Sequence, residues 1–271
     1  MKKIIIAADD YAMSASVDAG ILDLIQKGRL TATACLVLSP RWAEAAKKLN
    51  ADIRAKADIG LHLDFTEYDQ ALKESLPVLI ARSHLRMLPK KDLRTAINHQ
   101  LDLFEEALGF APDYVDGHLH VHQLPQIRDI LIEELCFRYG RKMPWIRVAR
   151  PPLKDGFKAF VIGFLGAKSM QEQLSVLGIR HTNQLLGVYQ FDMTLEGYAK
   201  QLENWLAYES LAHKKVALMC HPAMLLANQP EDAPHFAARW VEYQLLVDNF
   251  FKSLLEKNEI TLVRGEALGK H

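Results

Sequence analysis

The chain has 271 residues, of which 49% are hydrophobic and 24% charged, a composition typical of a globular protein long enough for one barrel-sized domain. Lysine plus arginine and aspartate plus glutamate number 33 each, so the formal charge is zero and no basic surface for nucleic acid is indicated. The apolar residues 4–8 are too few for a signal peptide, and residues 159–167 are too few for a membrane span. We therefore expect a soluble cytoplasmic protein with no nucleic-acid partner and no membrane insertion.

Short apolar runs alternate along the chain with runs that carry apolar residues at helical spacing. Strands are expected, in chain order, at residues 4–8, 31–38, 59–65, 113–122, 145–148, 184–188, 216–220 and 260–263. Helices are expected between them at about residues 16–28, 43–49, 93–108, 126–139, 158–177, 194–208 and 236–255. The helix over 93–108 follows a loop that contains Pro77 and Pro89, and Gly109 ends it.

Seven or eight short apolar strands separated by helices are typical of parallel βαβ units. An α/β fold in the form of a (β/α) barrel, irregular or incomplete, fits this pattern better than an open sheet. The sequence contains no internal repeat, and the only tempting boundary is the pair Pro151 and Pro152, after which too little chain follows for an independent core. We therefore expect a single domain over residues 1–271.

Polar residues gather at the predicted strand ends, where α/β barrels carry their functional groups. They are Asp9, Asp10, His62, Asp64, Asp116, His118, His120, His122, Arg147, Arg150 and His221. Adjacent strand residues point to opposite faces, so Asp9 and Asp10 share one site only if the chain bends there. One of them could then bind a metal while the other acts as a base; a solvated turn or a helix cap is the simpler alternative.

The stretch DYVDGHLHVH, residues 113–122, places three histidines at every second position. On an extended strand His118 and His122 would lie about 13 Å apart at roughly 3.3 Å per residue, so a single ion cannot take all three imidazoles. We expect one of them to ligate and the others to line the substrate cleft or support the ligands. One Asp and two His from different strands would leave coordination positions open, as in catalytic sites.

Such a mixed nitrogen and oxygen set suits Zn²⁺ and also manganese, iron or cobalt, and Mg²⁺ less well. We expect one divalent metal ion, with zinc or magnesium as the first candidates. His221 comes after a predicted strand and before Pro222, which restricts it to extended geometry and fixes where its imidazole points. A histidine placed in this way can protonate a leaving group, although it can also be a purely structural residue. His62, taken alone, also fits a buried core histidine.

Four segments, ADDYAMS at 8–14, GLHLDF at 60–65, DGHLHVH at 116–122 with LPQI after it, and CHPA at 220–223, resemble the motifs of the YdjC-like carbohydrate deacetylases. This family includes chitooligosaccharide deacetylases and hopanoid-associated HpnK-like proteins. The resemblance implies a deformed barrel of seven to eight strands, like that of polysaccharide deacetylases. It implies the following site residues: metal ligands Asp10, His62 and His118, catalytic base Asp9 and proton donor His221.

The chain departs from the family pattern at two places, Tyr11-Ala12 instead of Phe-Gly and Ala223 instead of Gly. Both places adjoin loops near the substrate, so they bear on specificity. Arg147 is expected to orient Asp9, and backbone N–H groups near Tyr11 to help stabilise the oxyanion. The residues expected to contact substrate are His120, His122, Arg147 and Tyr11.

The resemblance implies metal-dependent removal of an acetyl group from an N-acetylated sugar or glycoconjugate, which is a carbohydrate N-deacetylase activity. The expected partner is a small molecule, oligosaccharide or glycolipid, and a homodimer stays open. The alternative is a metal-dependent phosphoesterase or another amidohydrolase. Two bound metal ions per chain would favour this alternative. A non-catalytic sugar- or metal-binding protein is a third reading, which would have no use for both Asp9 and His221.

Overall fold

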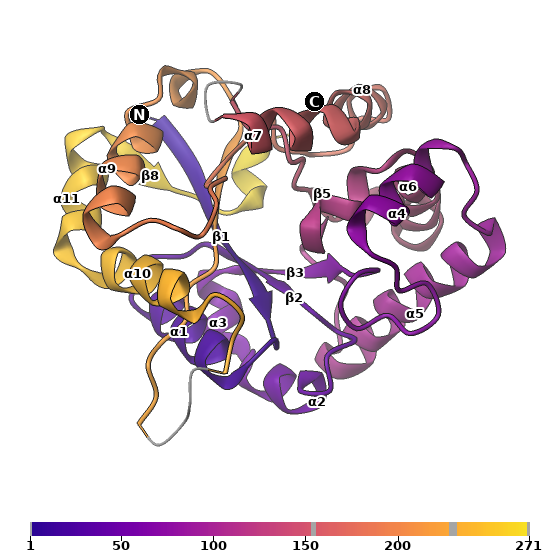
Figure 1. Ribbon diagram of the computed structural model, residues 1–271, viewed down its shortest axis with the longest axis horizontal. Helices are drawn as coiled ribbons and strands as arrows, with labels where there is room; N and C mark the ends of the chain where they lie inside the picture. Colours follow the sequence, from indigo (N-terminus) through magenta and orange to yellow (C-terminus); the bar gives the residue numbers. More distant parts are fainter. Residues whose placement is uncertain (1, 153–155, 228–231, 270–271) are drawn as a thin grey trace.

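The fold is built around a parallel sheet, seen at the centre of Figure 1. The computed structural model describes residues 2–152, 156–227 and 232–269. The strands are β1 (Lys2–Tyr11), β2 (Ala32–Cys35), β3 (Asp58–Leu63), β4 (Tyr114–Gly117), β5 (Trp145–Ile146), β6 (Gln184–Leu186), β7 (Val216–Cys220) and β8 (Ile260–Leu262). Their order is β5-β4-β3-β2-β1-β7-β6, with β8 beside the beginning of β1, and the paired strands run parallel.

The sheet curls on itself. A parallel bridge between Ile146 and His181 ties β5, at one end of the strand order, to the chain that leads into β6 at the other end. This arrangement confirms the expected deformed barrel of seven to eight strands.

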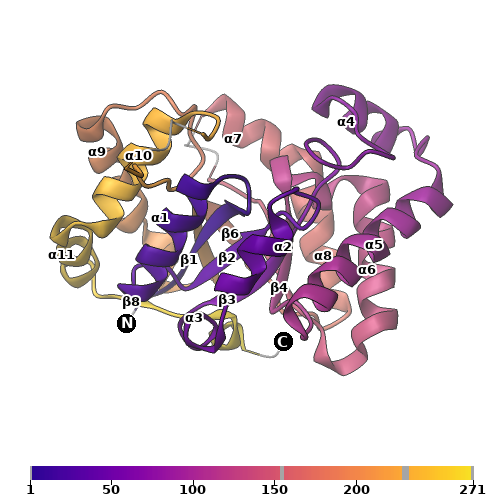
Figure 2. The ribbon, with the colours of Figure 1, turned by 90° about the horizontal axis from the view of Figure 1, so that it is seen from below.

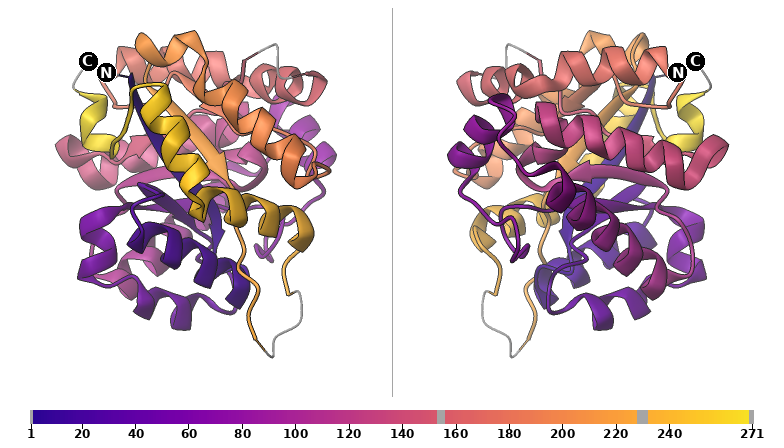
Figure 3. Two further views of the ribbon diagram at one scale, coloured as in Figure 1. Left: turned by 90° about the vertical axis from the view of Figure 1, so that its left-hand side faces the viewer. Right: turned by 90° about the vertical axis from the view of Figure 1, so that its right-hand side faces the viewer.

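Helices surround the sheet. They are α1 (Ala15–Gln26), α2 (Trp42–Ala45), α3 (Ala51–Lys56), α4 (Leu76–His84), α5 (Lys90–Leu108), α6 (Pro125–Tyr139), α7 (Phe157–Ile162), α8 (Lys168–Val176), α9 (Leu195–Leu206), α10 (Phe236–Val247) and α11 (Asn249–Lys257). Figure 2 shows α9, α10 and α11 on one side of the sheet and α4, α5 and α6 on the other. In Figure 3 the pair α5 and α6 lies side by side in the right-hand view, and α10 and α11 cross the left-hand view.

Two predicted helices are interrupted and two short ones were not predicted. A π-helical segment, Gly163–Ala167, separates α7 from α8, and Asp248 ends α10 and caps α11 through the backbone N–H of Phe250. Among the missed helices, α3 is capped by Asn50 and α4 carries Pro77 in its first turn. Proline is tolerated there, because the first N–H groups of a helix have no partner within it. The prediction of a loop around Pro77 was therefore wrong.

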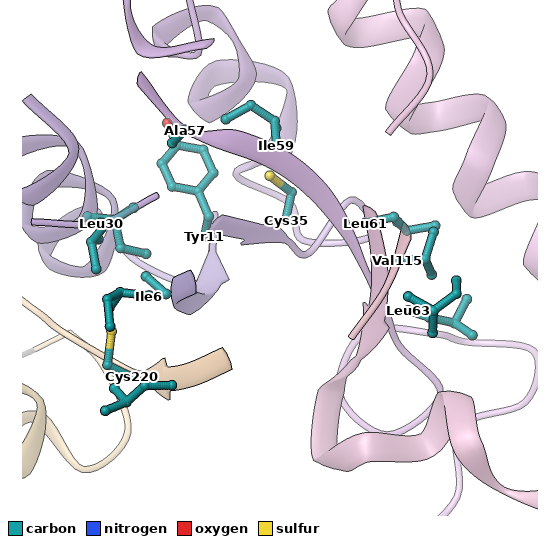
Figure 4. Packing of buried hydrophobic residues seen from close by; sticks show 14 of the residues in the cluster. Ile6, Tyr11, Leu30, Cys35, Ala57, Ile59, Leu61, Leu63, Val115 and Cys220 are labelled. Atoms are coloured by element: carbon teal, nitrogen blue, oxygen red, sulfur yellow. The ribbon is translucent and has the colours of Figure 1, made fainter. Parts of the chain in front are cut away.

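Alternation along the strands separates two apolar regions. Outward residues such as Ile6, Ile59 and Leu61 join the layer beneath the helices, part of which is drawn in Figure 4. Inward residues form a smaller cluster that includes Ile5, Ala7, Ala32, Ala34, Tyr114, Trp145, Leu185 and Ala217. The Tyr114 and Trp145 rings stack at 4.4 Å between centroids, and a Cβ at Gly60 would lie 2.4 Å from the Tyr114 ring. Glycine is therefore required beside this ring.

The C-terminal segment packs against the same interior cluster. Asp58 accepts hydrogen bonds from Trp145 Nε1 at 3.0 Å, from Gly265 N at 2.6 Å and from Arg264 Nε at 2.8 Å. A Cβ at Gly265 would lie 1.9 Å from Trp145 Nε1, so the backbone makes this close approach only with glycine. The interior is thus filled by side chains and backbone at the level of Asp58. In the part of the chain that the structure describes, no helix has the length and apolar character to cross a membrane.

Candidate active site

The end of β1 brings two adjacent carboxylates into one site. The strand pairs with β2 in register at Ala7 and Ala8, and the register shifts before Tyr11. Asp10 has φ 70°, in the left-handed region that aspartate tolerates better than most residues. This irregularity breaks the alternation, so Asp9 and Asp10 both reach the same group of side chains, and the bend that a shared site requires is present.

Asp9 points into the barrel and is held from one side. Its Oδ2 accepts a hydrogen bond from Arg147 Nη2 at 2.7 Å and lies 3.8 Å from His221 Nε2. Its Oδ1 is buried and, among the described residues, has no hydrogen-bond partner. Arg147 is itself buried and also reaches Asp116 Oδ2 at 2.7 Å. The expected contact between Arg147 and Asp9 is thus present, and it leaves one carboxylate oxygen available.

Asp10 is paired with an arginine from the C-terminal part of the chain. Its Oδ2 accepts a hydrogen bond from Arg239 Nη2 at 2.6 Å, and its Oδ1 lies 3.5 Å from His62 Nε2. Burial by itself would raise the pKa of Asp10, but Arg239 and the neighbouring histidines hold it well below the usual range. Asp10 is therefore an ionised carboxylate in a buried position.

His62 lies between two carboxylates. Its Nδ1 is 2.5 Å from Asp116 Oδ1, which leaves Nε2 directed toward Asp10. Burial would lower the pKa of His62, but the charge of Asp116 and the hydrogen bonds to Asp10 and Asp116 raise it to about 10. The surroundings of His62 therefore favour positive charge.

His118 follows directly after β4. Its Nδ1 is 2.8 Å from Thr66 Oγ1 and 3.7 Å from Asp64 Oδ1, while its ring meets that of His62 edge-on at 5.8 Å between centroids. Asp64 is fixed by backbone N–H groups of residues 66–68. Burial would raise the pKa of Asp64, but His118 and these hydrogen bonds lower it. His62 and His118 thus each have Nδ1 against an oxygen that fixes the ring.

The prediction of a strand over 113–122 was wrong beyond Gly117. Residues His118–Gln123 form a 3₁₀ segment in which Leu119 and His120 have positive φ of 51° and 61°. A Cβ at Gly117 would come within 3.0 Å of His122, so glycine permits this tight return of the chain. The three histidines therefore do not share one face, and the regular spacing of the sequence is not the spacing of the site.

The other residues expected to contact substrate occupy different environments. His120 is almost buried, and burial followed by the charge of Arg147 holds its pKa well below the usual value. His122 is fully buried, with Nε2 2.9 Å from Arg147 O. Tyr11 is directed into the outer apolar layer (Figure 4), where its hydroxyl donates to Ala45 O at 2.8 Å. Tyr11 and His122 have no exposed side-chain surface facing the carboxylates, and their expected substrate contacts stay predictions.

Two buried charges were missed by reasoning from the sequence. Arg239 and Glu242 lie on α10, three residues apart, and both are buried. Glu242 Oε2 accepts a hydrogen bond from His221 N at 2.6 Å. The signal that could have found them is their place in the helical stripe of Phe236, Tyr243 and Leu246, where charged residues have no solvent to face.

The donor set fits a divalent cation. Among the described residues, no three His, Cys, Asp or Glu side chains are gathered tightly enough to count as a formed metal site. Asp10 Oδ1, however, faces His62 Nε2, and Nδ1 of both His62 and His118 is engaged by an oxygen. Oxygens that hold Nδ1 in this way fix the ring for ligation through Nε2. Asp10, His62 and His118 are thus suitable ligands, although the three side chains have not converged on one point.

The model of the YdjC-like protein family matches residues 3–257. The chain belongs to this family. A carbohydrate deacetylase of Enterococcus faecalis is 32% identical over 98% of both chains, and one of Brevibacillus brevis is 25% identical over 98% of this chain and all of that protein. A chitooligosaccharide deacetylase of Proteus mirabilis is 31% identical over 54% of this chain and 59% of its own. The family expected from the motifs is confirmed.

Solved structures support the same fold. A protein of Enterococcus faecalis, provisionally described as a cellobiose-phosphate cleavage protein, superposes with a TM-score of 0.73 at 21% identity over 99% of both chains. A family 4 acetyl xylan esterase of Clostridium thermocellum, solved with a cobalt ion, gives a TM-score of 0.52 at 11% identity over 98% of this chain and 90% of that one. At these identities the likeness concerns the fold alone.

Proposed function

We propose that this YdjC-like protein is a carbohydrate N-deacetylase, a metal-dependent hydrolase that releases acetate from an N-acetylated sugar or glycoconjugate. The observation that carries the proposal is the surroundings of Asp9. One of its oxygens is held by Arg147, the other is buried without a partner, and His221 and the Asp10–His62 pair lie next to it. The names of the curated relatives support a carbohydrate substrate.

The metal would be held by Asp10, His62 and His118. A bound divalent ion polarises a carbonyl and lowers the pKa of water, which is the chemistry that amide hydrolysis needs. The raised pKa of His62 and the ionised Asp10 support the proposal, because both indicate surroundings that favour positive charge. The cobalt ion in the acetyl xylan esterase of the same fold points in this direction as well.

Asp9 acts as the general base. Its unpartnered Oδ1 accepts a proton from the water whose oxygen forms a bond to the acetyl carbon. Arg147 fixes the carboxylate through Oδ2 and leaves Oδ1 free to act. Because Arg147 also contacts Asp116, the partner of His62, base and ligands are held as one unit.

His221 acts as the general acid. Its Nε2 lies on the Asp9 side, so a proton on Nε2 can pass to the nitrogen of the amide as the carbon–nitrogen bond breaks. The products are the free amine and acetate. The two acid–base groups lie 3.8 Å apart at their nearest atoms, so both can serve one substrate carbonyl.

Deacetylation is favoured over phosphoester cleavage because the remaining buried carboxylates are engaged. Two-metal phosphoesterases need carboxylates that bridge the ions. Asp116 contacts His62 and Arg147, and Asp64 contacts Thr66 and its neighbours, so these two acids act on groups other than a second ion.

We further propose that the chain forms one catalytic domain. Its support is the pairing of β8, from the end of the chain, with β1, and the place of Arg264 and Gly265 beneath the barrel interior.

The test is acetate release from a panel of N-acetylglucosamine-containing compounds, with the bound metal measured in the same samples. We expect acetate from at least one compound, loss of the activity on chelation and one metal ion per chain. No acetate across the panel at saturating metal would contradict the function, and two ions per chain would favour a phosphoesterase.

A further inference from the structure

One turn of α10 contacts two different members of the proposed site. Arg239 donates to Asp10, whereas Glu242 accepts from His221, and both side chains are buried. Because Arg239 Nη2 is directed at Asp10, Glu242 is not paired with the cation nearest to it along the helix. A buried carboxylate without a paired cation is costly, so the other contacts of Glu242 have to offset this cost.

Glu242 approaches His221 with both oxygens. Oε2 accepts the backbone N–H of His221 at 2.6 Å, and Oε1 lies 3.8 Å from His221 Nδ1. Oε1 also accepts the hydroxyl of Tyr189 at 2.5 Å, so the carboxylate is fixed from a third direction. His221 Nδ1 is buried and, within the described ranges, has no hydrogen-bond partner. Oε1 of Glu242 is thus the acceptor that faces it.

The imidazole of His221 therefore lies between two carboxylates. Asp9 faces Nε2 and Glu242 faces Nδ1, each at 3.8 Å, and the ring edge meets Phe191 at 4.9 Å between centroids. The ionisable groups around it, from the elements packed there, are Asp9 and Asp10 of β1, His120 of the 3₁₀ segment, Tyr189, His235 behind Phe191, and Glu242 and Arg239 of α10. Of these, Glu242 is the acid that faces Nδ1, whereas Asp9 faces Nε2.

We propose that Glu242 is a positioning residue for His221, holding the backbone with one oxygen and facing Nδ1 with the other so that Nε2 is presented to the departing amine. This role rests on the proposed function, in which His221 protonates the amide nitrogen. The Nε2–H proton of the imidazolium passes to the amide nitrogen, the carbon–nitrogen bond breaks, and the neutral imidazole keeps its proton on Nδ1, opposite Glu242. A negative charge at this place favours the protonated ring and fixes its tautomer, as in other catalytic histidines backed by a carboxylate.

The test is the pair of variants Glu242→Gln and Glu134→Gln, assayed for acetate release from pH 5 to 10. Glu134 is a matched control, because it is a buried glutamate of α6 bonded to Arg94 and Asn98. Figure 2 shows α6 and α10 on opposite sides of the molecule. For Glu242→Gln we expect kcat to fall about 10²-fold with KM unchanged. The basic limb of the kcat/KM profile should move down by about 1–3 pH units, because the charge that favours the imidazolium is gone. Glu134→Gln should leave the profile in place.

A second variant tests the role of Glu242 even if Glu242→Gln does not fold. Tyr189→Phe removes a hydroxyl that donates to Oε1 and leaves the carboxylate, so the basic limb should move upward, in the opposite direction. Melting curves are recorded for each variant. An unchanged profile in folded Glu242→Gln, or an unchanged or lowered limb in Tyr189→Phe, overturns the role of Glu242. Absence of acetate release from the wild type would instead overturn the proposed function.

Discussion

The barrel interior consists of two layers that the same strands build. In the lower layer small and aromatic side chains fill the space, and its buried acid, Asp58, has hydrogen bonds at both oxygens. In the upper layer, at the C-terminal ends, negative and positive groups alternate in a chain of contacts: Asp9, Arg147, Asp116, His62, Asp10 and Arg239. Among the described residues, Asp9 Oδ1, Arg147 Nη1 and Arg239 Nη1 there still lack hydrogen-bond partners.

The difference indicates a division of work. Buried polar atoms without partners cost free energy, and a chain under selection for stability alone would pair them. In the lower layer both oxygens of Asp58 are paired and, among the described residues, the Tyr114 hydroxyl lacks a partner, whereas the upper layer leaves several such atoms that a substrate, water or ion can use. Changes in the lower layer should therefore act on stability, and changes in the upper layer on binding and catalysis.

The largest expected effect is that of Asp9→Asn. The amide cannot accept the proton from water, so kcat should fall by about 10²–10⁴-fold, the range for loss of a general base. Asp9 is not among the proposed ligands, so the metal content measured by elemental analysis should stay at the wild-type value. A variant that loses metal and activity together would mean that Asp9 belongs to the ligand set.

The next effect is a loss of folding stability in acid, caused by the fully buried His122. Burial lowers its pKa to about 4, against the attraction of Asp116, while the unfolded chain binds the proton near 6.5. Because the folded pKa is the lower one, this contribution is complete above pH 6.5 and is lost as the pH falls toward 4. The difference amounts to about 3 kcal/mol. Urea unfolding at several pH values should show a smaller loss over this window for His122→Gln than for wild type; equal slopes would refute the assignment.

A third comparison sets one buried acid from each layer side by side. Asp116→Asn weakens the support of His62, and losing such a partner reduces metal affinity by about 10–100-fold. Asp58→Asn acts on Trp145 and Arg264, so it should lower the melting temperature and leave metal affinity unchanged. Zinc titration against a competing chelator measures both variants without any substrate. Equal weakening by the two variants would show that the layers are not separate.

Much of this division can be read from the sequence, and the rest depends on contacts between distant segments. Alternation in β1 and β3, with Ile5 below Asp9 and Gly60 below His62, follows from the period of a strand. The left-handed turn at Asp10 does not, because its local sequence is compatible with continued extension. The end of β4 at Gly117 was hidden by a regular histidine spacing that imitates a strand.

Long-range partners were also beyond reach of the sequence. The motifs indicated Asp10 and His221, but Arg239 and Glu242 approach them from a helix that follows all the motif segments. Their positions depend on how α10 packs against α1 and α9, which no local pattern specifies. One general expectation would have indicated both residues: charged residues inside an apolar helical stripe need a buried partner.

The smallest expected effect comes from Gly60→Ala in the lower layer. The added Cβ would lie 2.4 Å from the Tyr114 ring, which is held by stacking on Trp145, so the ring cannot yield without disturbing that contact. Overpacking costs about 1–3 kcal/mol, and the reduced entropy of the unfolded chain offsets part of it, leaving a net loss of about 1–2 kcal/mol. In a Tyr114→Leu background the same substitution should cost less, because the two effects share one contact. Urea unfolding of the four proteins of this cycle measures the coupling.

If the layers are distinct, kcat of the folded Gly60→Ala variant stays at the wild-type value although His62 is only two residues away along β3. A fall in kcat without a fall in stability would show that the packing beneath the site sets its geometry.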